Sequence, residues 1–277
     1  DVVLPAQTFC ERNGIAFVSG AQRGSTINKV TQVGECKSDM QINLELGKRW
    51  NPEAWPWDNV DDMFTDMLKP TGMSFEEQKV APAYQPIEYY RYEKGMLRPD
   101  GQPGFNTPTG RIELWSNFYS RAGLDPLPYF EEPEPGPGST PDLMDEYPLV
   151  MTSGARFWGM FHSEHRQIER MRYYRPWPLM EIHPDTAAKY GIKDGDWVWM
   201  EGPMGRAKRK AKLTPQMDRR MVSCDHGWWF PEGDPEKFYD VFDLNINNTL
   251  PWIPGKSGFG SNYKSSICKI YKVQEGE

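Results

Sequence analysis

The sequence predicts a mixed α/β and β fold in two parts, a loop-rich α/β segment over residues 1–140 and a β-rich domain over residues 141–277. The stretch 131–141 reads EEPEPGPGSTP, which can form neither a helix nor an apolar face and is typical of a linker. Apolar residues with helical spacing occur before this linker, whereas period-two alternation of strands occurs after it. These three observations define the predicted organisation.

The first part contains two segments with helical spacing. Residues 58–68 carry an amphipathic pattern, and residues 40–46 carry a weaker one. Residues 104–114 combine Gly and Pro with a short alternating run, which predicts a turn that leads into a strand. The apolar residues with this helical spacing are Val60, Met63, Phe64, Met67 and Leu68.

The second part is predicted to begin with a strand at 147–151 that ends in a turn at Thr152–Arg156. Pro at the first helical position and a Gly after the last one bound a short helix over 184–190. The remaining expected elements are a helix near 163–173, a strand at 179–182, a hairpin of 197–200 with 207–213, and a strand at 267–273.

Alternation in the hairpin places Arg206, Lys208, Lys210 and Lys212 on one face and apolar residues on the other. The cationic face is expected to be solvated. Arg209 interrupts the apolar face, and we expect it to reach solvent at the end of a barrel; the alternative is a contact with a ligand.

Composition limits the class of function. The formal net charge of -7 argues against a general binder of nucleic acid or of anionic membranes, since both need a broad cationic surface. No apolar run approaches the roughly 20 residues needed to span a bilayer. The chain starts at Asp1 without an initiator Met, so we expect a fragment or a processed product, and the localisation is left open.

The four cysteines, at positions 10, 36, 224 and 268, are too scattered for an iron–sulfur motif and are expected to be buried thiols. All four histidines lie between 162 and 226, but no carboxylate or thiol accompanies them in a recognised ligand pattern. A metal site is therefore not predicted. His183 precedes a Pro and is expected to serve a turn or a helix cap.

The turn at Thr152–Arg156 has two interpretations. Gly154 permits close backbone approach, the hydroxyls of Thr152 and Ser153 can donate, and the guanidinium of Arg156 suits phosphate or carboxylate, so the turn can hold an anion. The alternative is a connection between a strand and a helix, with a Ser that caps the helix.

Three further segments offer groups suited to a flat, polar ligand. Residues 225–231 (DHGWWFP) place two tryptophans beside a glycine, and residues 245–249 (NINNT) carry three amides. Residues 258–264 (GFGSNYK) place an aromatic ring and a cation in a glycine-rich loop. Core packing and an Asx turn are the alternatives for the first two. Together with the turn at 152–156 the segments form a nucleotide-like set, without a Rossmann or P-loop signature.

At this point the chain resembles the C-terminal portion of the molybdopterin-dependent oxidoreductases of the dimethyl sulfoxide reductase family. Residues 1–5 (DVVLP) with 11–14 (ERNG) are similar to one element of the family, and residues 104–114 (GFNTPTGRIEL) are similar to its "GF.TPSGKIEL" signature. Residues 182–188 and 191–198 resemble its molybdopterin dinucleotide-binding domain. The resemblance implies that residues 141–277 form a double-psi β-barrel and that residues 1–140 are the C-terminal part of the central α/β domains plus the linker.

The resemblance also implies which positions contact the cofactor, and no catalytic or metal-ligating residue is implied in this chain. The implied cofactor-binding positions fall on the segments already selected on chemical grounds. They are Thr152, Ser153, Gly154, Arg156, His162, Ser163, His226, Gly227, Trp228, Asn248, Tyr263 and Lys264.

The implied cofactor is bis-molybdopterin guanine dinucleotide with molybdenum or tungsten, one dinucleotide arm of which this chain would hold. The metal performs two-electron or oxygen-atom-transfer chemistry, and its ligand and any iron–sulfur cluster would lie in sequence upstream of Asp1. The implied partners are the remainder of the catalytic subunit and an iron–sulfur electron-transfer subunit, with no nucleic acid and no direct membrane span. The alternative is a stand-alone barrel that binds no molybdenum cofactor.

The substrate is left open by the sequence. Phe157, Trp158, Tyr173, Tyr174 and Trp177 form an aromatic-rich region. Such residues suit an aromatic or otherwise unusual substrate, as in the branch of the family that contains catechol dehydroxylases and acetylene hydratase. The alternative is ordinary packing, which is the usual role of these residue types.

Overall fold

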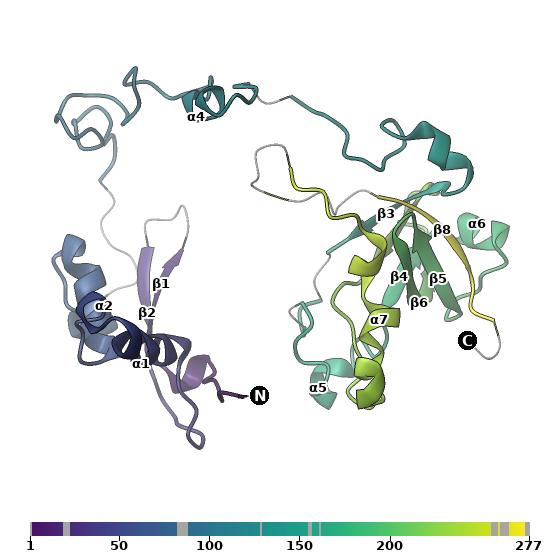
Figure 1. Ribbon diagram of the computed structural model, residues 1–277, viewed down its shortest axis with the longest axis horizontal. Helices are drawn as coiled ribbons and strands as arrows, with labels where there is room; N and C mark the ends of the chain where they lie inside the picture. The colour runs from purple at the N-terminus through teal and green to yellow at the C-terminus, as the bar shows by residue number, and fades with distance from the viewer. Residues whose placement is uncertain are drawn as a thin grey trace. The chain divides into compact units, whose positions relative to one another are not determined.

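A computed structural model gives the fold of the chain (Figure 1). It describes residues 2–18, 23–81, 88–127, 129–154, 157–160, 162–255, 260 and 266–274. The chain divides into two compact units, Asp1–Ile112 and Glu113–Glu277. Residues 113–140, which contain most of the predicted linker, belong to the second unit in this division, and the domain boundary expected near residue 140 stays a prediction. Each unit is described by itself.

The first unit combines a two-stranded antiparallel sheet with short helices. Its strands are β1 (Gly14–Val18) and β2 (Arg23–Ile27). Its α-helices are α1 (Asp39–Trp50), α2 (Val60–Leu68) and α3 (Phe75–Val80), and its 3-10 helices are η1 (Phe9–Glu11), η2 (Pro52–Ala54) and η3 (Lys69–Thr71). The helix predicted at 58–68 is confirmed by α2, and the weaker one at 40–46 lies inside α1.

Capping residues determine where these helices begin. The side chain of Ser38 accepts from the backbone N–H of Gln41 at 3.1 Å, and that of Asn59 accepts from Asp62 at 2.9 Å. Such caps satisfy N–H groups that have no partner inside the helix. The buried faces of the helices then meet in one apolar cluster of Leu44, Val60, Met63, Phe64, Leu68 and Phe75.

The second unit contains a closed six-stranded barrel and several short helices. The strands are β3 (Leu149–Ser153), β4 (Leu179–Ile182), β5 (Trp197–Gly202), β6 (Gly205–Leu213), β7 (Met221–Cys224) and β8 (Ser266–Lys272). The helices are α4 (Asn117–Arg121), η4 (Pro141–Asp145), α5 (Glu169–Arg172), α6 (Pro184–Lys189), η5 (Pro235–Asp240), α7 (Val241–Leu244) and η6 (Ile246–Thr249). The strand at 179–182 and the 197–213 hairpin are confirmed.

The strand order around the barrel is β3-β7-β4-β6-β5-β8. Two of the pairs, β3 with β7 and β4 with β6, are parallel, and the other four are antiparallel. Parallel neighbours cannot be joined by a hairpin, so long connections link them. The connections after β3 and β7 carry most of the segments that the sequence selected.

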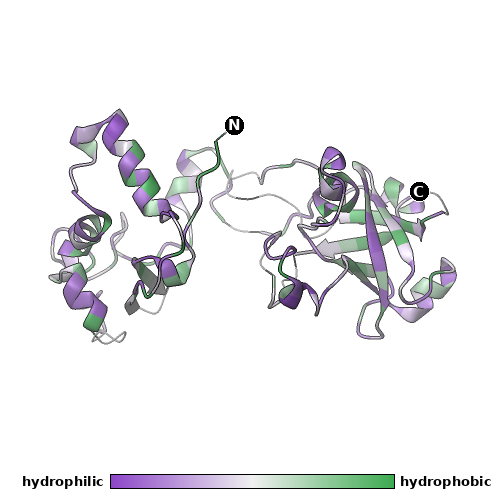
Figure 2. Ribbon diagram, turned by 90° about the horizontal axis from the view of Figure 1, so that it is seen from below, coloured by the Kyte–Doolittle hydropathy of each residue, from purple (hydrophilic) through white to green (hydrophobic). Residues whose placement is uncertain are grey.

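The barrel interior is filled by alternating side chains of all six strands. In Figure 2 hydrophobic and hydrophilic bands alternate on these strands, as period-two patterning requires. Met180, Ile182, Val198, Met200 and Val222 are fully buried there. Cys224 and Cys268 are also buried in this core, which confirms the prediction of buried thiols for these two, whereas Cys10 and Cys36 are partly exposed.

Two predicted elements were wrong. The helix expected near 163–173 is reduced to the single turn of α5, because His162 and His165 adopt positive φ angles of 48° and 70° and residues 162–167 form turns. The strand expected at the end of 104–114 does not form, since these residues make turns and bends. Gly104 has φ 123°, and the amide of Phe105 bonds instead to the carbonyl of Gly110 at 2.8 Å.

The solvent-exposed position expected for Arg209 is also wrong, because its side chain is 0% exposed. The neighbouring inward positions on β6 are Ala207 and Ala211, whose small side chains leave room for a long one.

Among the residues that the structure describes, none of the helices has both the length and the apolar character needed to cross a membrane.

Candidate functional site

The parallel pairing of β3 and β7 brings two of the predicted segments to one edge of the barrel. Thr152 pairs with Ser223 and Ser153 pairs with Cys224, so both strands end at the same level. Thr152 and Ser153 therefore lie in the strand and not in the turn that was predicted for them. Gly154 follows with φ 89°, as expected for a glycine that turns the chain. The segment Asp225–Trp229 leaves β7 beside it.

A close backbone approach joins this edge to His162 and Ser163. Gly227 has φ 60°, and a Cβ atom at this position would lie 3.0 Å from the carbonyl carbon of His162 and 3.1 Å from the nitrogen of Ser163. Only glycine permits this contact without displacement of the neighbouring backbone. The ring nitrogens His162 Nδ1 and His226 Nε2 lie 2.9 Å apart, so the two imidazoles are hydrogen-bonded to each other.

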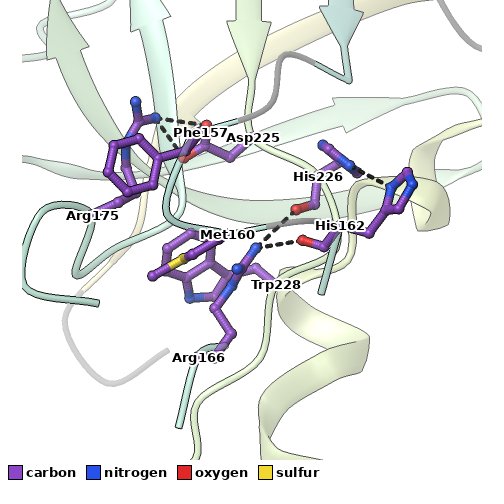
Figure 3. Close-up of a pocket in the computed structure, with 8 residues that line it drawn as sticks. All are labelled: Phe157, Met160, His162, Arg166, Arg175, Asp225, His226 and Trp228. Carbon is purple, nitrogen blue, oxygen red and sulfur yellow. Dashed lines mark hydrogen bonds and ion pairs between the residues drawn. The ribbon is translucent and has the colours of Figure 1, made fainter. Parts of the chain in front are cut away.

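Arg166 holds these loops together (Figure 3). Its side chain is 3% exposed, and its terminal nitrogens donate to the carbonyls of His162 at 2.7 Å, Gly227 at 3.2 Å and Glu164 at 2.9 Å. Burial lowers the pKa of Arg166 to about 10, which still leaves it charged at neutral pH. The buried guanidinium of Arg166 therefore stabilises the positive φ of His162 by binding the carbonyl of that residue.

Trp228 lies under this guanidinium and is 1% exposed. The Arg166 carbon Cζ is 4.2 Å from the centroid of its ring, a cation–π contact. The face that the sequence offered to a flat ligand is therefore covered by Arg166, and core packing is the role that the structure gives to Trp228. Its neighbour Trp229 is only partly buried and donates from Nε1 to the carbonyl of Ser163 at 2.7 Å.

Among the residues that the structure describes, two buried donors in this region have no hydrogen-bond partner, Arg166 Nε and Trp228 Nε1. Both residues line a small cavity of about 10 Å³, together with Phe157, Met160, His162, Arg175, Asp225 and His226 (Figure 3). Asp225 in turn accepts from Arg175 at 2.7 Å, and the pair is largely buried. The two unpaired donors therefore border a cavity that has room for about one water molecule, which would supply an acceptor.

A larger groove of about 370 Å³ opens on the outer side of the same loops. One wall carries His162, Ser163 and the segment His226–Trp229, and the other carries Asn245 and Asn247 beside α7. The side chain of Asn245 accepts from the backbone N–H of Asn247 at 3.0 Å, which confirms the Asx turn. Backbone carbonyls, amides, imidazoles and an indole thus face one volume. We call it the loop groove.

The structure brings together some of the predicted positions and not others. His162, Ser163, His226, Gly227 and Trp228 line the loop groove. Thr152, Ser153 and Gly154 lie at the adjacent strand ends. Arg156, Tyr263 and Lys264 lie outside the described residues.

Asn248 does not line the groove, because its side-chain amide donates to the carbonyl of Phe242 and its own carbonyl lies against the β5–β6 turn. Ser163 caps no helix, since α5 starts at Glu169. His183 caps α6, as predicted, by accepting from the backbone N–H of Asp185 at 3.1 Å. Among the described residues no group of three or more His, Cys, Asp or Glu side chains is arranged to hold a metal ion.

Sequence reasoning missed Arg166 and passed over Asn245 and Asn247 as individual positions. Arg166 stands in the run SEHRQIER, which suggests an ordinary solvated helix, and nothing local marks it as buried. The two asparagines belong to the amide-rich segment that was selected, but the turn of η6 determines which amides face the groove. A buried Arg next to an aromatic ring is visible only after the chain has folded.

The loop groove lies at the strand-end edge of a closed barrel, within residues 149–248, and this segment matches the family model described as "Molydopterin dinucleotide binding domain". Similarity to known proteins extends over most of the chain. Acetylene hydratase of Syntrophotalea acetylenica is 34% identical over 85% of this chain and 32% of its own length. Dopamine dehydroxylase of Eggerthella lenta is 30% identical over 99% of this chain and 34% of its own length.

A trimethylamine-N-oxide reductase of Haemophilus influenzae is 26% identical over 86% of this chain and 32% of its own length. The solved structure of acetylene hydratase from Pelobacter acetylenicus superposes with a TM-score of 0.83 and 29% identity, over 98% of this chain and 38% of that one. The chain therefore belongs with the homologues of the dimethyl sulfoxide reductase family and contains their molybdopterin dinucleotide-binding domain. It spans about a third of the length of the curated relatives it matches.

Proposed function

We propose that the chain holds one guanine dinucleotide arm of bis-molybdopterin guanine dinucleotide in the loop groove, as part of a molybdenum or tungsten oxidoreductase. We also infer that the closed barrel is of the double-psi type. The observation that carries the proposal is the convergence of His162, Ser163 and His226–Trp229 with Asn245 and Asn247 around one volume inside the matched domain. The cofactor class follows from the domain match, and the grip on a single arm is our inference.

The chemistry of the groove fits the nucleotide part of such a cofactor. Amide groups on one wall can read the polar edge of a base, and the partly exposed indole of Trp229 on the other offers an apolar surface. Buried Arg166 supplies positive charge behind the loops that line the groove. A diphosphate carries negative charge, so the two charges are complementary.

The redox chemistry belongs to the metal and pterin, which carry two electrons or an oxygen atom when bound. The residues of this chain orient the nucleotide end and exclude water from it. The metal ligand and any iron–sulfur cluster belong to the remainder of the catalytic subunit, with which this chain would act. An iron–sulfur electron-transfer subunit is the further partner that we propose.

The binding test uses the 277-residue chain and guanosine diphosphate, with adenosine diphosphate and guanosine monophosphate as comparisons. We expect calorimetry to show guanosine diphosphate binding at least tenfold more tightly than either comparison, and affinity that falls as salt rises. Equal binding of the three nucleotides, or binding of none, would contradict the proposal.

A second test addresses the alternative of a stand-alone barrel. Purification from the native host should recover this sequence within a longer polypeptide that carries molybdenum or tungsten, as metal analysis would show. Recovery of a complete, metal-free chain of this length would instead favour the stand-alone binding module.

A further inference from the structure

We propose that Arg209 is a positioning residue that locks the two walls of the loop groove in their relative placement. The inference rests on the proposed function for its ligand, but its geometry does not depend on which ligand binds. Arg209 is far from the groove along the chain and touches none of its open surface. It acts through the backbone of both walls.

The guanidinium of Arg209 reaches both walls from inside the barrel. Its Nη1 donates to the carbonyls of Lys208, at 2.8 Å, and of Leu244, and its Nη2 donates to the carbonyl of Asp225 at 3.0 Å. Leu244 is the last residue of α7, and Asp225 is the first residue after β7. One planar group therefore holds the ends of two separate elements.

Each anchored carbonyl lies directly before a wall of the groove. Leu244 precedes Asn245 on one wall, and Asp225 precedes His226 on the other. The angle between the two amino groups of a guanidinium is fixed, so the distance between the two carbonyls is fixed as well. A shift of either carbonyl would move the imidazole or the amide that follows it.

The β5–β6 hairpin approaches the amide wall at a second point. A Cβ atom on Gly205 would lie 2.7 Å from the carbonyl oxygen of Asn248, and one on Gly202 would lie 2.9 Å from that of Thr249. The η6 turn is therefore seated on the hairpin that carries Arg209. The wall that carries Asn245 and Asn247 therefore packs on the β5–β6 hairpin. Arg209 connects this hairpin to the other wall, which carries His226, through the carbonyl of Asp225.

The guanidinium of Arg209 is held mainly by backbone groups. Among the described residues its terminal nitrogens donate to backbone carbonyls, its side chain also contacts the thiol of Cys224, and its Nε has no hydrogen-bond partner. Burial lowers the pKa of Arg209, because the barrel interior is a poor solvent for a cation. An apolar side chain at this position would fill a barrel core at no such cost. A buried Arg at position 209 is favourable if its hydrogen bonds fix the loop ends and its positive charge attracts a bound anion.

The test compares three variants of the 277-residue chain. Arg209→Met removes the charge and the two wall contacts at similar length, and Arg209→Lys keeps the charge but cannot present two amino groups. Lys212→Met is the matched control, because it removes a cation from the same strand at an exposed position paired with Glu181. The readouts are guanosine diphosphate affinity, the thermal midpoint, and hydrogen exchange of the amides in 226–229, 245–249 and 149–153.

We expect Arg209→Met to weaken guanosine diphosphate binding at least tenfold and Arg209→Lys to weaken it by a smaller factor, with Lys212→Met unchanged. Amide exchange should accelerate at least tenfold in 226–229 and 245–249, and it should stay as in the parent chain in 149–153. Arg209→Met could fail to fold, and then Arg209→Lys carries both measurements. Local exchange and affinity equal to those of Lys212→Met in a folded Arg209 variant would overturn the proposal.

The hydrogen-exchange readout separates the two proposals. If the parent chain binds no guanosine diphosphate, the proposed function fails, but accelerated exchange confined to the two walls still supports the role of Arg209. If the parent chain binds the nucleotide and neither wall responds to Arg209→Lys or Arg209→Met, the proposed function stands and the role of Arg209 is refuted.

Discussion

The interior of the barrel and the loops at its edge are built by different means. The barrel core is formed by apolar residues of six strands, and its members, such as Met180, Val198 and Val222, are fully buried. The loop side has a smaller apolar cluster of Met160, Trp228 and Leu244, with Phe157 and Phe230 packed against it and Arg166 lying on the indole. The first region is stabilised by apolar burial, which has no preferred direction. The second depends on directed hydrogen bonds from guanidinium groups to carbonyls.

From this difference we expect stability and the proposed binding to be separable in this domain. Burial of apolar area in the barrel supplies free energy without fixing any ligand contact. The carbonyl anchors fix ligand contacts, but their desolvated cations contribute little net free energy of folding. A variant in one region should therefore change one property and spare the other.

The largest expected effect on stability comes from Met180→Ala in the barrel core. Met180 is 0% exposed, and truncation of a buried Met to Ala costs about 2–5 kcal/mol. We expect the urea midpoint to fall by a corresponding amount, while guanosine diphosphate affinity of the folded chain stays within twofold. Met204→Ala is the control, since Met204 is 62% exposed. A large loss of affinity in Met180→Ala would break the proposed separation.

A smaller effect on stability but a larger one on binding is expected for Gly227→Ala. The φ of 60° costs an alanine about 1–2 kcal/mol, and its Cβ would press on the backbone of His162. Gly195→Ala is a matched control, because Gly195 has φ 80° but no heavy atom within 4 Å of the added Cβ. Gly227→Ala should lose more stability than Gly195→Ala by urea unfolding, because only its Cβ meets neighbouring backbone. Only Gly227→Ala should lose affinity for guanosine diphosphate, by about tenfold.

The smallest effect is expected at alkaline pH and concerns the barrel alone. Burial raises the pKa of the Cys224 thiol from 9.0 to about 12. The stability that this neutral thiol contributes is complete below pH 9 and is lost as pH rises from 9 toward 12, because the thiol of the unfolded chain ionises first.

Cys224→Ala should therefore lessen the decline in the free energy of unfolding between pH 7 and pH 10, by about 1 kcal/mol. Urea titrations at both pH values measure this difference. Cys36→Ala, at a partly exposed site, serves as the control. A decline in Cys224→Ala that matches that of the Cys36→Ala chain would show that the thiol does not titrate as burial requires.

Sequence patterns predicted the elements whose causes are local. Apolar spacing determines α2, Pro184 and Gly191 bound α6, and alternation defines the β5–β6 hairpin. Each of these signals acts within a few residues of the element it specifies. The positions of Gly154 and Gly227 were also predictable, because their role depends on backbone conformation.

The failures have a common cause in long-range contacts. Arg209 interrupts an alternating strand, and only the carbonyls of Leu244 and Asp225, distant in sequence, explain its burial. The predicted helix after His162 was lost because Arg166 holds the His162 carbonyl in a conformation that no helix permits. Ordinary packing, the alternative role for Trp158, Tyr173 and Tyr174, is not seen within this unit, since all three are more than half exposed and Tyr174 contacts the other two.

The closure of the barrel sets an order of events during synthesis. Strand β8 pairs with both β3 and β5, and it is the last of the six along the chain. The loops that form the groove leave the ribosome before β8 does. The barrel that supports these loops therefore lacks one of its six strands until residue 272 has emerged. Because distant pairings form slowly, a complete groove arises only after translation of the whole domain. If the groove holds the proposed dinucleotide arm, we expect loading of the cofactor to follow synthesis of the domain.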